Sequence, residues 1–217
     1  MKTNKIHSLV GGVILAALLM AGCVSNSYDK GAATAAALQN SANAVSETSA
    51  RVNDVLAALN SLTFKPQGDL RMQFDAFKTA AGKLNLATGK LDSTVLDMRI
   101  RAANYFANWT NELATIQSDE IHQRSSARKD EVIGKLSKVD ASYQGVKDAF
   151  RPFVSDVKDI QTYLGTDLTV GGLDTIKDIV ARTKTDAVPL RDAVKKLQSD
   201  FSDLSTALSP VVPAPEK

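Results

Sequence analysis

The sequence has little of the side-chain chemistry on which thiol enzymes and disulfide-rich proteins depend. It contains one cysteine, Cys23, among 217 residues, so no disulfide can form within the chain. Histidine occurs twice, proline six times and glycine twelve times. The scarcity of helix-breaking residues, together with abundant alanine, leucine, lysine and aspartate, favours helices over sheets. These shortages indicate a helical protein with few catalytic groups.

Long hydrophobic runs are also scarce, and the clearest one lies at the N-terminus. Leu9–Met20 is too short to span the ~30 Å hydrocarbon core of a bilayer. Lys2 and Lys5 precede this run and small residues follow it, which is typical of a cleaved export signal. The run ends in Leu19–Cys23, which resembles the lipobox of bacterial lipoproteins, with Met20 in place of the more usual leucine.

This resemblance implies that residues 1–22 are a signal peptide and that Cys23 is acylated as the first mature residue. The competing interpretation is a buried N-terminal helix with an incidental cysteine. Val24 rather than aspartate follows Cys23, which by resemblance to lipoprotein sorting in Gram-negative bacteria favours the outer membrane, facing the periplasm. Anchoring in the inner membrane is the alternative. We expect three acyl chains, palmitate among them, because one chain anchors only marginally. Residues 23–31 would form a short polar tether.

The mature chain also lacks an excess of charge of either sign. Removal of residues 1–22 takes two of the 26 basic residues and none of the 24 acidic residues, which leaves a formal net charge of zero. A neutral chain has no long-range field to attract phosphate backbones, which argues against nucleic acid as a partner. With Cys23 acylated, no thiol remains for catalysis or for metal binding.

Apolar residues recur beyond the tether at alternating steps of three and four, the spacing of amphipathic helices with heptad seams. The predicted helices are 32–62, 70–116, a third that starts at 119 or 126 and ends at 164, and 173–208. Short turns make the last two antiparallel neighbours. The predicted fold class is all-α: an elongated antiparallel, coiled-coil-like bundle of about four helices over residues 32–209, followed by a proline-rich, disordered tail at 210–217.

The seams of the second, third and fourth helices define the predicted core. Their members are Phe74, Phe77, Ala81, Leu84, Thr88, Leu91, Val95, Met98, Ala102, Tyr105 and Trp109; Val132, Leu136, Val139, Tyr143, Val146, Phe150, Phe153, Val157, Ile160 and Leu164; and Leu173, Ile176, Val180, Thr183, Ala187, Leu190, Val194, Leu197, Phe201, Leu204 and Leu208. The first helix is alanine-rich with a narrow apolar stripe, so we expect it to be the loosest.

Capping residues and prolines mark where the helices start and bend. Asp69 offers an N-cap to the second helix, and Thr166 or Thr169 offers one to the fourth. Pro152 and Pro189 lie inside the third and fourth helices, and the sequence predicts kinks there.

A search for catalytic patterns gives weak candidates. Asp119, His122 and Ser126 are spaced to share one helical face, but a hydrolase also needs an oxyanion hole and a nucleophile in a pocket. We therefore interpret this stretch as a solvated connector. A di-iron bundle needs a second histidine and several inward carboxylates, whereas the seams carry only Glu112. No metal site, cofactor or catalytic residue is predicted.

Nucleotide binding is likewise not supported by the sequence. Gly82-Lys83 and Gly89-Lys90 are each followed by leucine, and neither has a glycine five positions earlier, so no phosphate-cradling GxxxxGK[ST] loop is present. Tyr105, Phe106 and Trp109 could form a stacking platform, but aromatic residues at helical spacing are far more often core.

Three stretches resemble a family of uncharacterised proteobacterial lipoproteins, domain of unknown function 2959. They are Ala103–Leu113, Arg124–Arg128 and Phe150–Leu164, and the likeness extends from about Phe74 to Leu204. The resemblance implies an all-helical fold and brings no catalytic residues. The alanine-rich first helix lies outside it, so the packing of that helix stays open.

Three functional hypotheses remain, and none is enzymatic. The leading one is a membrane-anchored periplasmic lipoprotein of the Gram-negative envelope with a structural or protein-binding role, acting through a protein partner or self-association. The alternative is a carrier of a lipid or other apolar ligand between the kinked helices, in a groove flanked by Tyr143, Phe150 and Phe153. A third is a peptidoglycan-linked tether through Lys217, by resemblance to the major murein lipoprotein.

Overall fold

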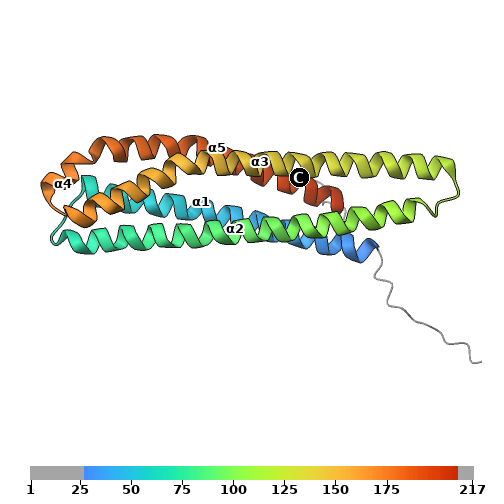
Figure 1. Cartoon of the computed structure of the whole chain (residues 1–217), viewed down its shortest axis with the longest axis horizontal. Coiled ribbons are helices and arrows are strands. Elements are labelled where there is room, and N and C mark those ends of the chain that lie inside the picture. The colour runs from blue at the N-terminus through green and yellow to red at the C-terminus, as the bar shows by residue number, and fades with distance from the viewer. Residues whose placement is uncertain (1–26, 210–217) are drawn as a thin grey trace, which may run out of the picture.

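The computed structural model describes residues 27–209, and the regular elements in this part of the chain are all helices. They are α1 (Ser27–Phe64), α2 (Leu70–Leu113), α3 (Asp119–Thr166), α4 (Val170–Thr175) and α5 (Lys177–Leu208). The four long helices lie antiparallel in one elongated bundle (Figure 1). The predicted all-α bundle is confirmed. The predicted signal peptide at 1–22, Cys23 and the tail at 210–217 lie outside the described residues.

The helices form where the heptad pattern predicts them, because each buries its apolar stripe against its neighbours. On α5 every predicted seam position from Val180 to Leu208 is buried, Thr183 included. On α3 the predicted seam is buried except at Leu136, which is half-buried. Full burial of a leucine, isoleucine or phenylalanine side chain stabilises the fold by about 1.5–3 kcal/mol. The seams therefore supply most of the driving force for the bundle.

Side-chain caps fix where three of the helices begin. Asp69 accepts a hydrogen bond from the backbone of Arg71 at 3.0 Å, as predicted. Ser118 accepts one from Ile121 at 3.4 Å, which places the start of α3 at residue 119 rather than 126. Thr169 caps α4 through the backbone N–H of Gly172 at 3.1 Å.

Several boundaries differ from the sequence prediction. α1 and α3 each end two residues later than predicted, at Phe64 and Thr166. Residues 27–31, expected in the tether, already belong to α1. The second helix ends at Leu113, directly before a turn, rather than at residue 116. The predicted fourth helix is two helices, α4 and α5, interrupted at Ile176. Glycine is required in this connection, because a Cβ at Gly172 would lie 2.3 Å from the carbonyl oxygen of Asp167.

The alanine-rich helix α1 lies at the centre of the packing. It packs closely against both α2 and α5, while α3 packs mainly against α5. Small buried side chains at Thr34, Ser41 and Thr48 let its neighbours approach, and each hydroxyl donates to the carbonyl four residues earlier. Our expectation that α1 is the loosest helix is therefore wrong.

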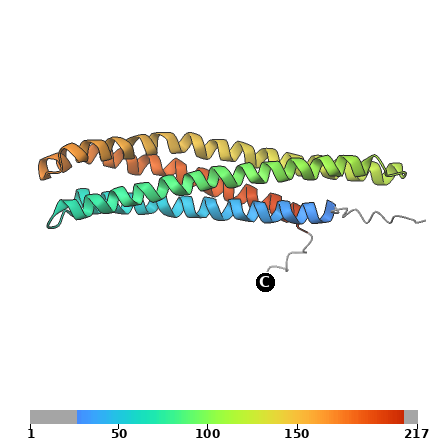
Figure 2. The ribbon, with the colours of Figure 1, turned by 60° about the horizontal axis from the view of Figure 1, so that its bottom comes forward.

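The two ends of the bundle differ in cross-section. The hairpin between α2 and α3 extends beyond the start of α1 and the end of α5 (Figures 1 and 2). Four long helices lie together in the middle of the bundle, and two continue to the hairpin tip, as the unequal helix lengths predict. Pro152 and Pro189 lie inside α3 and α5, which continue on both sides of them.

Candidate functional site

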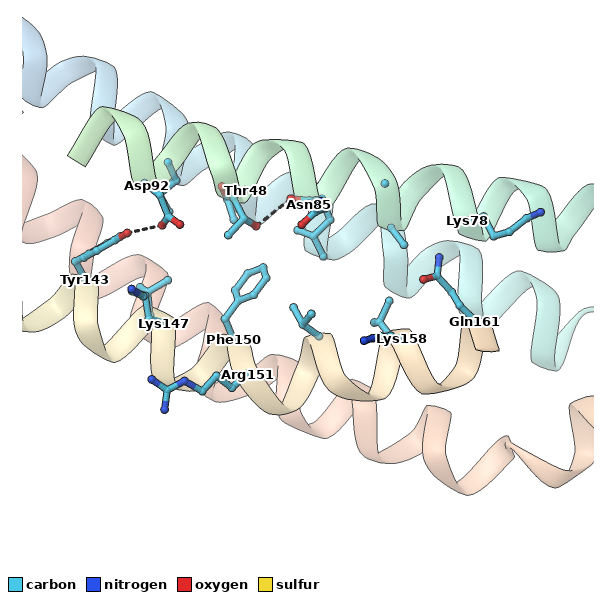
Figure 3. A pocket seen from close by; sticks show the side chains of 18 residues that line it. Thr48, Lys78, Asn85, Asp92, Tyr143, Lys147, Phe150, Arg151, Lys158 and Gln161 are labelled. Atoms are coloured by element: carbon cyan, nitrogen blue, oxygen red, sulfur yellow. Dashed lines mark hydrogen bonds between the residues drawn. The ribbon is translucent and has the colours of Figure 1, made fainter. Parts of the chain in front are cut away.

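Helices α2 and α3 separate along part of their length and leave a groove between them. The groove has a volume of about 680 Å³ and is lined by α2 from Lys78 to Asp92 and by α3 from Tyr143 to Gln161. Figure 3 shows Phe150 projecting from α3 into the space that faces α2. The groove exists because α2 packs against α1 and α3 packs against α5, with little direct contact between α2 and α3.

Small side chains on α2 keep the groove open. Ala81 and Thr88 were predicted in the seam, but they are only half-buried, and Ala80 and Ala87 take the buried positions. Gly82 also lines the groove, and a Cβ at this position would meet no atom within 4 Å. Because the seam of α2 turns toward α1, the residues left facing α3 are too small to fill the space.

The walls of the groove are predominantly apolar and well fixed. Leu84, Leu91, Val146 and Val157 line it while remaining at most 5% exposed, so their positions are set by the core. Phe150 is 8% exposed. A groove of this kind, with rigid apolar walls and a volume between about 300 and 1,000 Å³, has the properties of small-molecule sites in proteins.

One end of the groove is closed by polar contacts between α2 and α3. The hydroxyl of Tyr143 donates a hydrogen bond to the carboxylate of Asp92 (Figure 3). Burial, and then this hydrogen bond, raise the pKa of Tyr143, so the phenol stays protonated at physiological pH. Beyond it, Arg99 binds Asp140 at 2.7 Å, and the indole of Trp109 donates to Ser125 at 2.9 Å. These links all lie between the groove and the hairpin tip. At the other end of the groove, no side-chain hydrogen bond or ion pair joins α2 to α3 within residues 27–209.

Positive charge predominates along the rim of the groove. Lys78, Lys147, Arg151 and Lys158 line it, and Asp92 is the one carboxylate among the described lining residues. Lys78 pairs with Asp75 at 2.7 Å, and Arg151 pairs with Asp148 at 3.4 Å.

Two of the rim cations have no carboxylate partner in the described part of the chain. Lys147 and Lys158 form no ion pair within residues 27–209; the Lys147 ammonium lies 5.7 Å from the ring centre of Tyr143. Near Lys158, the Gln161 side chain lies between α2 and α3 (Figure 3). The rim therefore keeps positive charge available to a ligand.

The sequence predicted part of this site and misplaced part of it. Tyr143 and Phe150 line the groove as expected, but Phe153 is fully buried and does not. The groove lies between α2 and α3, whereas the expected one was opened by Pro152 and Pro189. Neither proline lines it. The signal that could have located it is the small size of two seam residues, Ala81 and Thr88, with Gly82 beside them.

The polar triplet considered in the sequence lies far from the groove. Asp119, His122 and Ser126 occupy the first two turns of α3, near the hairpin tip, and no hydrogen bond joins their side chains within the described residues. Asp119 and His122 are exposed. Across residues 27–209, no cluster of histidine, cysteine and acidic side chains is arranged to hold a metal. Cys23 and Lys217 lie outside the described residues.

The aromatic cluster of the hairpin is a packing feature. Tyr105, Phe106 and Trp109 are half-buried, with ring centres 5.4 to 6.5 Å apart, and they pack against the core. Tyr105 also lies beside Gly31, where a Cβ would come within 3.3 Å of its ring. The cluster therefore supports the start of α1.

Comparison with known proteins identifies the family of the chain and gives no relative of known activity. None of the five described helices is both long and apolar enough to cross a membrane. No curated protein and no solved structure matches the chain. A family model described as "Protein of unknown function (DUF2959)" matches residues 25–207, so the family includes the first helix that the sequence resemblance left out. With this match over most of its length, the chain belongs to the family of domain of unknown function 2959.

Proposed function

We propose that this protein is a non-enzymatic, membrane-anchored lipoprotein of the Gram-negative envelope that binds an elongated apolar ligand between α2 and α3. The observation that carries the proposal is the apolar groove of about 680 Å³, bounded by two helices that have little direct contact with each other. This was the alternative hypothesis from the sequence, and the groove favours it over a purely structural role.

The physical basis of binding is removal of apolar surface from water. Leu84, Phe150 and Val157 present fixed hydrocarbon to the groove, so a ligand chain that lies against them contributes about 0.8 kcal/mol for each buried methylene. The groove extends along α2 from Lys78 to Asp92, which at 1.5 Å per residue is about 21 Å. An extended hydrocarbon chain fits this shape better than a compact ring system.

The groove lies toward the end of the bundle opposite the proposed anchor. Cys23 precedes Ser27 by four residues, so an acylated Cys23 lies within about 14 Å of the start of α1. The start of α1 is on the hairpin side of the bundle, and the groove extends from Asp92 toward the opposite end (Figure 1). We propose that the bundle projects from the membrane, so that the groove opens into the periplasm, with the outer membrane as the proposed site of anchoring and the inner membrane as the alternative.

The test is ligand recovery from two matched variants. Gly82 and Gly89 are both exposed glycines of α2 with open space around a Cβ, but only Gly82 lines the groove. Protein purified from membranes is analysed by native mass spectrometry and by extraction into organic solvent. We expect one apolar molecule per chain in the wild type and in Gly89→Phe, and none in Gly82→Phe. Empty wild-type protein, or equal occupancy in both variants, would contradict the proposal.

A structural or protein-binding role is the second candidate, favoured by an exposed apolar stripe on α2. Leu86, Leu96 and Ile100 share one helical face and are 75%, 57% and 53% exposed. Crosslinking in cells, with mass spectrometry of the captured species, tests it. We expect Leu96→Lys to abolish a crosslinked partner or dimer if this face is an interface. Attachment through Lys217 stays a further proposal, tested by whether muramidase changes electrophoretic mobility.

A further inference from the structure

The charges around the groove narrow the kind of apolar ligand it takes. The rim carries four cations, Lys78, Lys147, Arg151 and Lys158, against one carboxylate, Asp92. Asp92 already accepts the Tyr143 hydroxyl. Lys78 and Arg151 are paired with Asp75 and Asp148, so a neutral ligand would leave the charges of Lys147 and Lys158 uncompensated. Such a local excess beside an apolar trough matches a molecule with both a hydrocarbon chain and an acidic head group.

We propose that the ligand is a single-chain anionic amphiphile whose acid head group binds at the end of the groove near Lys158 and Gln161. This inference rests on the proposed function, because it assigns a chemical class to the ligand of the same groove. A carboxylate and a phosphate monoester share the required chemistry, since both accept charge-assisted hydrogen bonds from ammonium groups.

The two ends of the groove are not equivalent for an anion. At the closed end Lys147, unpaired among the described residues, lies 5.7 Å from the Tyr143 ring centre. There, however, the Asp92 carboxylate repels a second negative charge, and its Tyr143 partner has its only donor engaged. At the open end Lys158 has no carboxylate partner among residues 27–209, and the Gln161 side chain lies in the gap (Figure 3). The head group therefore binds at the open end, and the tail points toward Tyr143.

The apolar lining follows the path that this orientation gives the tail. From Lys158 the tail passes Val157, Phe150 and Val146 on α3, with Leu84 and Leu91 on the side of α2. The chain ends against the Tyr143–Asp92 contact, which limits its length. Affinity should rise by about fourfold for each added methylene until the tail reaches that contact, and then level off.

The experiment compares acids with alcohols of the same chain length, below the concentration at which micelles form. It uses the full mature chain carrying Cys23→Ser, so that its own acyl chains do not compete for the groove. Saturated fatty acids, the matching alcohols and the matching alkyl phosphates are titrated by displacement of a fluorescent fatty acid. We expect both acids to bind at least about fivefold more tightly than the alcohol at low salt, with the difference reduced in high salt.

Matched lysine variants locate the head group. Lys83 is an exposed lysine of α2 that does not line the groove. We expect Lys158→Ala to weaken binding of the acids by about fivefold and to leave the alcohol unchanged. Lys83→Ala, which removes the same charge, should change neither. The carboxylate and phosphate series then show which acid the site prefers.

The possible failures are distinguishable. If acid and alcohol bind equally, and both are lost in Gly82→Phe, the groove binds an apolar ligand and the head-group inference is wrong. If Lys83→Ala weakens the acids as much as Lys158→Ala does, the preference reflects overall charge, and the inference is again wrong. If no amphiphile binds, or if Gly82→Phe binds as the wild type does, the proposed function itself fails.

Discussion

The contacts of α2 with its two neighbours in sequence are very different. α2 packs against α1 closely along the bundle, yet it separates from α3 over the length of the groove, although both pairs are consecutive and antiparallel. α1 and α2 differ in the number of stripes of side chains that each helix buries. α1 buries a second row at Thr34, Ser41 and Thr48 beside its apolar seam, and so serves two neighbours. α2 uses its one stripe on α1, and α3 uses most of its own on α5.

The lesson is that a heptad seam predicts a helix with a buried face, and does not predict which neighbour buries it. Side-chain size decides how closely two helices approach. The small residues of α1 allow two close contacts, whereas the small residues of α2 at Ala81 and Gly82 face a helix that is already engaged elsewhere. The same kind of side chain therefore produces close packing in one region and a groove in the other.

The closely packed part of the bundle around α1 should be the most sensitive to truncation of a buried side chain. Leu59 of α1 is fully buried, so Leu59→Ala is expected to lower the free energy of unfolding by about 2–5 kcal/mol through lost burial and a cavity. Leu86→Ala on α2, where the side chain is 75% exposed, should change it by at most about 0.5 kcal/mol. Urea unfolding followed by circular dichroism measures both. Similar losses for the two variants would mean that α1 is not the centre of the packing.

The ion pair between α3 and α5 should contribute more to stability than the ion pair between α2 and α3. Asp156 of α3 is buried and accepts from Arg182 of α5 at 2.7 and 3.0 Å, so Asp156→Ala should cost about 1–3 kcal/mol. Asp140 of α3 pairs with Arg99 of α2 at 2.7 Å, but both side chains are about two-fifths exposed. Asp140→Ala should therefore cost less than about 1 kcal/mol by the same unfolding measurement. The reverse order would contradict the assignment of α3–α5 as the tighter pair.

The closed end of the groove should depend on one hydroxyl. Tyr143→Phe removes the hydrogen bond to Asp92 and should lower the free energy of unfolding by about 0.5–1.5 kcal/mol. Hydrogen exchange should increase in α2 around Asp92 and not around Leu59 of α1. Tyr163→Phe, whose hydroxyl lies 3.4 Å from Asp167, is the control and should have a smaller effect. Unchanged exchange around Asp92 would show that this contact does not hold the two helices together.

The same tyrosine gives a pH dependence of known sign. The pKa of Tyr143 is raised, first by burial and then by Asp92, so the folded chain holds the phenol proton more tightly than the unfolded chain does. Its stabilisation is complete below about pH 10 and is lost as the pH rises further. The difference in unfolding free energy between wild type and Tyr143→Phe should therefore shrink above pH 10. A constant difference up to the highest pH at which the protein folds would contradict this.

The smallest expected effect is a gain of stability at the exposed glycines of α2. Gly82→Ala adds a methyl group where a Cβ meets no atom within 4 Å, so it should stabilise the protein by about 0.5–1 kcal/mol through helix propensity. Gly89→Ala should do the same. Gly172→Ala should destabilise, because its Cβ would lie 2.3 Å from the carbonyl oxygen of Asp167. The thermal unfolding midpoints of the three variants distinguish positions with space for a methyl group from the position without it.

Local sequence patterns predicted much of the fold but little of the candidate site. The seam of α5 and the caps at Asp69 and Thr169 are confirmed, because periodicity and capping are properties of a few neighbouring residues. The buried role of Thr34, Ser41 and Thr48 was missed, since small polar residues carry no apolar signal. The groove was attributed to prolines instead of to small residues, because the sequence does not state which helices are neighbours.

The sequence by itself determined that the chain forms long amphipathic helices, since alternation of three and four follows from the helical repeat and needs no partner. It also determined where α2 begins, because a side-chain cap acts within three residues, whereas the start of α3 was left open between residues 119 and 126. Only the tertiary structure decided that α1 lies between α2 and α5, and that α2 and α3 enclose a groove with a positive rim. Those features depend on competition among the helices for the same buried surface, which involves residues far apart in the chain.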